Sequence, residues 1–292
     1  MNRNVGIVLV GGRSSRMGSS KPALEWHGST LVRRVAGIVA RGVGGPVVLV
    51  RSPGQSLPLL PADFEILEDL EEGRGPLGGL SAALEALAGR GEIAYVSSTD
   101  VPFLHPSFVR RVLGELGSEL DACVPFVRGL RHPLAAAYRV GLAPLVKRLV
   151  TSDQLRVSAL FDDCRWRQLD ESDLLADADL ARLDPGLESV TNLNDQYDYQ
   201  AARDRLPPAI QVQWLSGGPG SRLPAQSGTP ADAGGAARVT IRAATLGAAA
   251  EAFDVVLGSN IVAALNGEPV RQDPEEPLVE GDVVVFATEA GG

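Results

Sequence analysis

A glycine pair followed by three cations is the part of this sequence best suited to chemistry. The apolar residues 5–10 lead into Gly11-Gly12, and the cations that follow are Arg13, Arg16 and Lys21. Glycines let a backbone approach a phosphate closely with its N–H groups pointing at it, and the cations would neutralise the charge of that phosphate. The spacing differs from a Walker P-loop, which requires GxxxxGK[ST]. The alternative is an ordinary turn between a strand and a helix with solvated arginines.

Short apolar runs alternate with helical periods, and these elements must position the loop. The runs that predict strands cover 5–10, 46–50, 65–67, 93–98, 122–127 and 134–138, and the helical periods cover 30–42, 79–90, 108–116 and 195–205. Strands that alternate with helices of this length indicate an α/β fold with a mostly parallel sheet covered on both faces. Such sheets bind ligands at the carboxyl ends of their strands, where Gly11-Gly12 and Thr99-Asp100 fall.

The composition is that of a folded protein with an acidic balance. The chain has 292 residues, of which 45% are hydrophobic and 22% are charged, and its formal net charge is −9. This hydrophobic content excludes global disorder. We expect no nucleic-acid partner, which would need a basic footprint, although local groups suffice to bind a small anion. We also expect no membrane contact, because no apolar run approaches the roughly 18 residues that span a bilayer.

The number and spacing of the cysteines and histidines argue against a stabilising disulfide framework and against a zinc site. Cys123 and Cys164 form no CxxC pair, and the three histidines are scattered. Two cysteines do not hold together a chain of this length, so we interpret them as thiols in a reducing compartment. No signal-peptide pattern is visible at the start of the chain. Together these features predict a cytoplasmic protein.

The pattern changes near residues 206–208, which indicates a second domain. A strand at 210–215 precedes residues 216–237, which contain six glycines, three prolines and three serines and read as a flexible excursion. Strands then follow at 238–241, 261–265 and 282–286, with a helix at 246–253 and a hairpin turn signal at Asn266-Gly267. We therefore predict one domain over 1–206 and a small β-rich domain over 209–292.

Residues 9–22 resemble a known nucleotide-binding signature. Their pattern, L-x-G-G-x-x-x-R-M-G-x-x-K-P, is similar to that of the molybdenum cofactor guanylyltransferases, the MobA family. Further matches follow in the family's order: Leu67-Glu68-Asp69 with Gly75-Pro76-Leu77-Gly78-Gly79, Ser97-Ser98-Thr99-Asp100-Val101-Pro102, Arg131-His132-Pro133-Leu134, Gln154-Leu155-Arg156-Val157 and Thr191-Asn192-Leu193-Asn194. The resemblance implies a Rossmann-like nucleotidyltransferase domain.

The resemblance also implies a reaction. Enzymes of this family transfer GMP from GTP to the phosphate of molybdopterin and release pyrophosphate. Attack at an α-phosphate brings two anions together, so catalysis consists mainly of positioning and charge neutralisation. Mg²⁺ is expected to bridge the phosphates. GTP and molybdopterin are thus the expected small-molecule substrates.

Roles for individual residues follow from the matched motifs. The resemblance assigns Asp100 to the metal, Lys21 and Arg16 to the triphosphate, and Asp69 to the nucleotide, with the loop residues Leu9, Val10, Gly11, Gly12 and Arg13 also binding the nucleotide. His132, Asn192 and Asn194 are the expected contacts of molybdopterin. The alternatives are an Asx turn at Asp100, a solvated acidic run at Asp69 and a packed ring at His132.

The loop also bears on the choice of base. Cytidylyl relatives usually carry L-A-A-G where guanylyl members carry L-A-G-G, and Gly11-Gly12 follows the guanylyl form. The sequence departs from the usual pattern at Val10, at Arg51-Ser52 and at Asp195-Gln196. We expect GTP rather than CTP as the nucleotide.

The last segment resembles a second family, the ubiquitin-like sulfur carriers called the MoaD family. The matching residues are 261–270, 277–286 and the closing Gly291-Gly292. The resemblance implies a β-grasp domain whose terminal glycine is adenylated and converted to a thiocarboxylate, with an adenylating enzyme and the large subunit of molybdopterin synthase as partners. A side-chain-free terminus can enter another enzyme's active site. The alternative is a frayed glycine end.

Two other functions remain open from the sequence. The chain could be a sulfur carrier whose first domain is a non-catalytic scaffold. It could also be a nucleotidyltransferase for another phosphorylated substrate, through cytidylyl transfer or with a sugar phosphate. Lys21, Asp100 and Asn194 argue against the scaffold, and His132-Pro133 argues against the other substrate.

Overall fold

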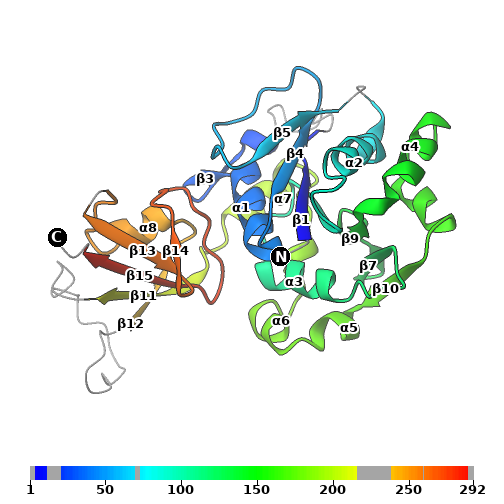
Figure 1. The fold of residues 1–292 in the computed structure, drawn as a ribbon. Helices are drawn as coiled ribbons and strands as arrows, with labels where there is room; N and C mark the ends of the chain where they lie inside the picture. Colours follow the sequence, from blue (N-terminus) through cyan, green and yellow to red (C-terminus); the bar gives the residue numbers. More distant parts are fainter. Residues whose placement is uncertain (1–3, 12–20, 70–72, 216–237, 259, 289–292) are drawn as a thin grey trace. The chain divides into compact units, whose positions relative to one another are not determined.

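The chain forms two compact units. The computed structural model describes residues 4–11, 21–69, 73–215, 238–258 and 260–288. Residues 1–24 with 30–200 form the first unit, and residues 25–29 with 201–292 form the second (Figure 1). The predicted loop residues Gly12, Arg13 and Arg16 and the terminal pair Gly291-Gly292 lie outside the described residues.

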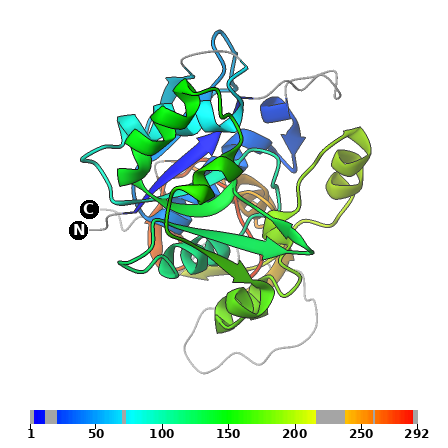
Figure 2. The ribbon, with the colours of Figure 1, turned by 90° about the vertical axis from the view of Figure 1, so that its right-hand side faces the viewer.

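The first unit is built on an eight-stranded sheet. Its order is β10 (Trp166–Asp170), β7 (Ala122–Val127), β9 (Ala135–Arg139), β6 (Ile93–Ser98), β1 (Asn4–Leu9), β4 (Val47–Arg51) and β5 (Glu65–Glu68), and β8 (Leu130–Arg131) pairs with β7. Of these described strands, β9 and β8 pair antiparallel with their neighbours, and all other pairs are parallel. The strands β7, β9 and β10 face the viewer in Figure 2. The mostly parallel sheet is as predicted.

Helices cover this sheet on both faces. On one face α2 (Gly75–Ala86) and α4 (Ala143–Thr151) bury leucines and valines against the strands. On the other, α1 (Leu31–Val43) packs against α3 (Pro106–Gly114) and the strands (Figure 1). Short helices complete the unit: η1 (Lys21–Ala23), η2 (Val140–Leu142), η3 (Val157–Asp162), α5 (Glu171–Leu175), α6 (Ala178–Leu183) and η4 (Glu188–Val190), while α7 (Gln196–Arg203) leads into the second unit.

The predicted bounds of one helix and one strand need correction, and two elements were missed. The helix predicted at 79–90 is α2, which begins four residues earlier, because Pro76 suits a first turn whose N–H groups have no helical partner. The strand predicted to include Val10 ends at Leu9. Strand β10 and helix α4 were absent from the predicted elements. The sequence of β10, WRQLD, buries only Leu169 fully, so it lacks the apolar run of a central strand.

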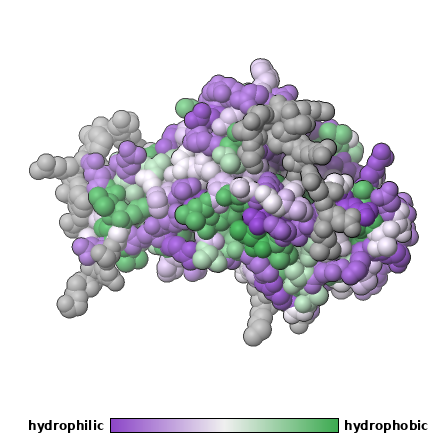
Figure 3. All heavy atoms as spheres, turned by 90° about the horizontal axis from the view of Figure 1, so that it is seen from above, coloured by the Kyte–Doolittle hydropathy of each residue, from purple (hydrophilic) through white to green (hydrophobic). Residues whose placement is uncertain are grey.

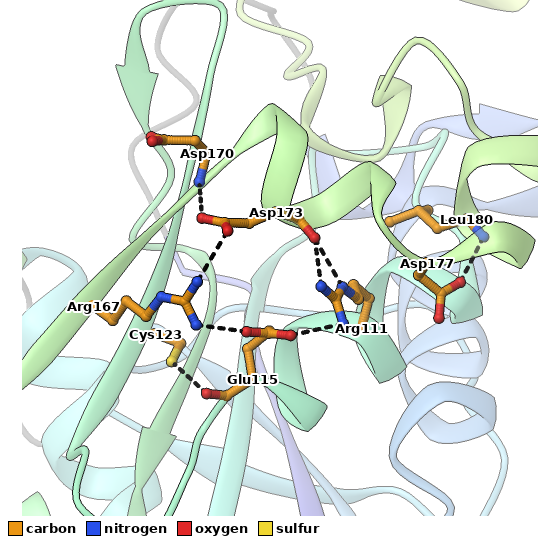
Figure 4. A network of polar contacts seen from close by, with 8 residues as sticks. All are labelled: Arg111, Glu115, Cys123, Arg167, Asp170, Asp173, Asp177 and Leu180. Carbon is orange, nitrogen blue, oxygen red and sulfur yellow. Dashed lines mark hydrogen bonds and ion pairs between the residues drawn. The ribbon is translucent and has the colours of Figure 1, made fainter.

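A network of charged groups fastens the edge strand β10 (Figure 4). Glu115 receives Arg111 Nη1 at 2.7 Å on one carboxylate oxygen and Arg167 Nη1 at 2.8 Å on the other. Arg167 Nη2 also donates to Asp173 Oδ1 at 2.9 Å, and Arg111 Nε donates to the carbonyl of Asp173 at 3.1 Å. The Cys123 thiol donates to the carbonyl of Glu115, and burial raises its pKa to about 11. These contacts join α3, β10 and α5.

The second unit has a sheet and a core of its own. The sheet order is β12 (Arg238–Arg242), β11 (Ala209–Leu215), β15 (Val283–Thr288), β13 (Ile261–Leu265) and β14 (Glu268–Val270). Strands β11 and β15 pair in parallel at its centre, and the other pairs are antiparallel. Helix α8 (Leu246–Glu251) supplies Leu246, Ala249 and Ala250 to the core on one face. A short ladder of β2 (Glu25–Trp26) and β3 (Ser29–Thr30) follows η1 in the chain.

The hairpin predicted at Asn266-Gly267 is confirmed. Both residues have left-handed backbones, with φ of 54° and 89°, as a two-residue turn between β13 and β14 requires. The Asn266 amide donates to Asp282 Oδ1 at 2.8 Å and accepts from the Val283 N–H at 2.8 Å. The buried Asp282 carboxylate also accepts from the Val279 N–H. The turn is therefore tied to the start of β15.

One face of the molecule is mainly polar. Hydrophilic residues dominate the face shown in Figure 3, and smaller hydrophobic areas lie between them. In the part of the chain that the structure describes, no helix combines the length and the apolar composition needed to cross a bilayer.

Candidate functional site

The end of β1 meets the end of β4 at the predicted nucleotide loop. Leu9 and Val10 are buried, so their side chains face the core. The Val10 N–H donates to the carbonyl of Val50 at 2.8 Å, and its carbonyl accepts from the Gln55 amide at 3.3 Å. A Cβ at Gly11 would lie 2.8 Å from Ser52 Oγ and 3.2 Å from the Ser52 backbone nitrogen, so a side chain at this position would displace the Ser52 hydroxyl. Leu9 and Val10 thus hold the end of β1 through packing and backbone hydrogen bonds.

Asp100 stands two residues after the end of β6, at the carboxyl edge of the sheet. One carboxylate oxygen, Oδ1, accepts from Ser98 Oγ at 2.6 Å. The other, Oδ2, lies 3.7 Å from Lys21 Nζ. The Asp100 side chain is 21% exposed and that of Lys21 is 23% exposed. The pair is therefore fixed by the fold and still accessible to a ligand.

Residue Leu193 joins this pair to the predicted molybdopterin segment. Lys21 Nζ donates to the carbonyl of Leu193 at 2.6 Å, and the Leu193 N–H donates to the carbonyl of Asp100 at 2.8 Å. Asn192 and Asn194 flank Leu193 and are exposed. Residues separated by more than 90 positions in sequence thus meet at one edge of the sheet. The fold brings together Lys21, Asp100 and the asparagine segment.

Arg34 supports the Asp100 turn from the opposite side and was missed by the sequence analysis. It lies on α1, is buried, and its Nε donates to the carbonyl of Pro102 at 2.6 Å. A buried guanidinium requires hydrogen-bonding partners, so this bond also satisfies Arg34. The available signal was the arginine pair Arg33-Arg34 within the apolar period of the predicted helix.

Asp69 directly follows β5, and its carboxylate lies beside the glycines of α2. Its N–H donates to the carbonyl of Arg51 at 2.8 Å, which continues the pairing of β4 with β5. A Cβ at Gly78 would lie 3.3 Å from both carboxylate oxygens of Asp69, and one at Gly79 would lie 3.2 Å from Leu9 Cδ2. The two glycines therefore let α2 approach both Asp69 and β1. Asp69 is half-buried at the same carboxyl edge of the sheet.

His132 lies at the base of the β7–β8 hairpin. Its N–H donates to the carbonyl of Pro125, and its Nε2 lies 3.3 Å from the carbonyl of Val127. Burial lowers the pKa of His132, the Val127 carbonyl opposes that shift, and the charge of Arg128 adds to it. The ring is therefore neutral near pH 7. Because Nε2 faces a carbonyl, that nitrogen carries the proton and Nδ1 is left as an acceptor.

The carboxylate of Asp100 fits a magnesium ion that is brought by a nucleotide. Among the described residues, no group of three or more His, Cys, Asp or Glu could hold a metal. Mg²⁺ differs from metals that need such a cage, because it is usually held by one or two carboxylates, substrate phosphates and water. A half-buried carboxylate beside a lysine ammonium can therefore share a cation with a triphosphate.

A family match accounts for this arrangement. The profile of the MobA-like NTP transferase domain matches residues 6–167, more than half of the chain. The chain belongs to this family. It is therefore an enzyme of the nucleotidyltransferase class, and its MobA-like domain contains β1, α2, Lys21 and Asp100.

Curated relatives carry matching names. A Mycobacterium tuberculosis protein named "Probable molybdenum cofactor guanylyltransferase" is 36% identical over 161 residues, which are 54% of this chain and 78% of that protein. A Bacillus cereus protein of the same name is 28% identical over 211 residues, which are 70% of this chain and 98% of that protein. The MobA-like domain is thus similar to these relatives over most of their length.

A solved structure shares the fold. Molybdopterin-guanine dinucleotide biosynthesis protein A from Archaeoglobus fulgidus superposes with a TM-score of 0.52 at 22% identity. The match covers 68% of this chain and 97% of that protein. At this identity the similarity shows the α/β nucleotidyltransferase fold of the first unit.

Proposed function

We propose that the chain transfers GMP from GTP to the phosphate of molybdopterin. The observation that carries this proposal is the meeting of Lys21, Asp100 and the segment 192–194 at the carboxyl edge of the sheet. The family membership and the names of its relatives support the same reaction. We further propose that the reaction takes place in the cytoplasm, since both cysteines are free thiols.

In this reaction a phosphate oxygen of molybdopterin attacks the α-phosphorus of GTP. A new P–O bond forms, the bond between the α-phosphorus and the bridging oxygen breaks, and pyrophosphate leaves with that electron pair. Lys21 is placed to bind phosphate oxygens, since its ammonium already lies between a carbonyl and a carboxylate. Asp100 would hold Mg²⁺, which when bound neutralises phosphate charge.

The second substrate would contact the asparagine segment and His132. Asn192 and Asn194 present amide groups at the surface beside Lys21. His132 is neutral with Nδ1 as an acceptor, so it suits an N–H donor of the pterin rather than a phosphate. Gln154 and Arg156 are further surface groups of the segment matched in the sequence. We assign these groups to binding and orientation of molybdopterin.

The test is product formation with the purified full chain. The protein is incubated with molybdopterin, Mg²⁺ and either GTP or CTP, and the native chain is compared with Asp100→Ala and with the exposed control Asp179→Ala. We expect pyrophosphate and guanylylated pterin from GTP with the native chain and the control, and loss of both with Asp100→Ala. Product from CTP would overturn the base assignment. Folded protein that yields no product with either nucleotide would overturn the transferase proposal.

We also propose a division at residues 206–209 and a sulfur-carrier role for residues 209–292. The arrangement of the second unit supports it: its first and last strands pair in parallel at the centre, and one helix follows its second strand. This strand order supports the proposal of a β-grasp fold, the ubiquitin-like fold that the sequence resemblance implies. The buried Asp282 and the turn at Gly281 lie within the matched segment.

This second role is tested by mass. The chain is incubated with a carrier-adenylating enzyme, ATP and a sulfur donor, and then with the large subunit of molybdopterin synthase. We expect the mass increase of one oxygen replaced by sulfur, localised to Gly292, and its loss during synthesis of molybdopterin. A variant lacking Gly291-Gly292 serves as the control. An unchanged mass in a folded protein would overturn the carrier role and leave the transferase proposal untouched.

A further inference from the structure

Arg128 occupies a turn position that does not favour arginine. It forms the β7–β8 turn with Gly129, and the two residues have φ of 53° and 75°. A two-residue turn with both backbones left-handed favours asparagine, aspartate or glycine, because a larger side chain is strained there. The fold therefore accepts strain to place this guanidinium.

The guanidinium of Arg128 ties this turn to the chain that precedes Asn192. Its Nη1 donates to Thr191 Oγ1 at 2.9 Å, and its Nη2 donates to Glu188 Oε1 at 2.7 Å and to the carbonyl of Gly186 at 2.7 Å. Thr191 Oγ1 in turn donates to Glu188 Oε2 at 3.3 Å, which closes a ring of polar contacts. The Arg128 side chain thus donates hydrogen bonds to three residues of the segment 186–191.

The β7–β8 hairpin and the segment that precedes Asn192 both lead to predicted molybdopterin contacts. His132 lies at the base of the hairpin, with Nε2 near the carbonyl of Val127, the residue before Arg128. Asn192 follows Thr191 directly. The Arg128 N–H also donates to Glu171 Oε1 at 2.8 Å, so the turn is held by α5 as well. The contacts of Arg128 therefore fix the position of His132 relative to Asn192.

Stability does not explain this arginine. Its side chain is 48% exposed, and exposed ion pairs contribute little to folding. The inner side of the same segment has its own anchor, since the buried Asp184 accepts from the N–H groups of Glu188 and Ser189 at 2.6 and 3.0 Å. Loss of the Arg128 contacts should then loosen Thr191 while the segment remains folded.

We infer that Arg128 is a positioning residue for molybdopterin. It sets the placement of the His132 hairpin relative to Asn192–Asn194 and does not itself touch the substrate. The inference rests on the proposed function, because it concerns the second substrate of that reaction. It adds a residue that none of the matched sequence motifs contains.

The decisive variant is Arg128→Asn. Asparagine suits the turn better than arginine but lacks the guanidinium, so the variant separates folding from positioning. We expect an unfolding temperature equal to or above that of the native chain. We also expect a KM for molybdopterin about tenfold higher, because the groups that contact it lose their fixed relative placement, with an unchanged KM for GTP.

Two further variants complete this experiment. Arg128→Lys keeps the charge but not the planar fork, so we expect only partial recovery of the molybdopterin KM. Arg182→Ala removes an exposed arginine whose ion pair with Asp179 lies within α6, and we expect native kinetics. A molybdopterin KM for Arg128→Asn equal to that of the native chain would overturn the inference.

Amide hydrogen exchange supplies a readout that needs no substrate. We expect faster exchange at residues 191–194 in Arg128→Asn than in the native chain, with no change in β6 or α2. If the native chain formed no product from molybdopterin, the proposed function would fail. The exchange rates would still show whether Arg128 holds residues 191–194 in place. Equal exchange rates at residues 191–194 in the two proteins would overturn the inference that Arg128 holds this segment in place.

Discussion

The Lys21 ammonium contacts two parts of the candidate site, the Leu193 peptide and the Asp100 carboxylate. It binds the carbonyl of Leu193 at 2.6 Å and lies 3.7 Å from the carboxylate of Asp100. Phosphate oxygens of a nucleotide would compete for the same hydrogens, since an ammonium has only three. If Lys21 binds the nucleotide as proposed, that binding would also affect the segment that we propose contacts the second substrate.

This arrangement predicts that Lys21 is required for catalysis. Lys21→Ala should lower kcat/KM by about a hundredfold or more, as when one donor to developing charge is removed. Lys21→Arg should recover little, because a planar fork does not replace a compact ammonium between two oxygens. Steady-state kinetics check both variants. Lys147→Ala is the control, since that lysine is exposed and paired with Glu85. Less than a threefold loss in Lys21→Ala would contradict the assignment.

The pKa of His132 predicts a pH dependence of stability. Burial lowers this pKa below the value of about 6.5 that the unfolded chain has. Between the two pKa values the unfolded chain binds more protons, so the free energy of unfolding should fall as the pH drops below about 6.5. It should level off below the native pKa.

Urea unfolding of the native chain and His132→Gln checks this sign. The native chain should lose more stability than the variant between pH 7.5 and 5.5, and the two should change in parallel between pH 7.5 and 8.5. Equal losses on acidification would show that His132 is not the group responsible.

At the scale of elements, the edge strand β10 depends on charge as well as on apolar contact. Glu115 stands between Arg111 and Arg167, and its side chain is 17% exposed. Removing its charge would leave two guanidinium groups facing each other across a half-buried site. Glu115 therefore joins α3 to β10, while Arg111 and Arg167 each also bond Asp173 of α5.

Glu115→Gln should therefore destabilise the first unit by about 1–3 kcal/mol, the cost of weakening hydrogen bonds to charged groups. Chemical denaturation measures this change. Glu119→Gln is the matched control, because Glu119 is nearby, 88% exposed and paired only loosely with Arg165 at 3.6 Å. Its effect should be within about 0.5 kcal/mol. Equal effects of the two variants would argue that the network adds nothing to stability.

The elements that the sequence revealed are those with a strong apolar pattern. Strands β1, β4, β6 and β7 are buried on both faces and read as apolar runs, whereas β10 is polar and was missed. Among site residues, Lys21 and Asp100 could be predicted from their types and motifs. The Leu193 peptide and Arg34 could not, because their contacts are with backbone groups, which any residue type can supply.

At the scale of the whole molecule, each unit has its own hydrophobic core. Leucines and valines of the eight-stranded sheet and its helices form one, and Phe286, Leu278 and Leu246 belong to the other. Cores that share no residues allow separate unfolding transitions. We therefore expect a destabilising change inside one core to move the unfolding transition of that unit.

Asp282→Ala should act on the second unit alone. It removes acceptors for the Asn266 amide and the Val279 N–H inside a buried site, which should cost about 2 kcal/mol. Calorimetry should show one transition moved to lower temperature, and titration calorimetry should show unchanged GTP binding. A loss of GTP binding together with the shift would contradict independent units.

The near absence of lysine has a practical consequence for labelling chemistry. Besides the N-terminal amine, the chain offers acylating reagents only Lys21 and Lys147. Lys147 is 65% exposed, whereas the Lys21 amine is engaged with Leu193. Lys147 can thus serve as an internal reference for the rate of acylation. We expect the ratio of the two labelled peptides to report occupancy of the proposed nucleotide site without any mutation or fluorescent analogue.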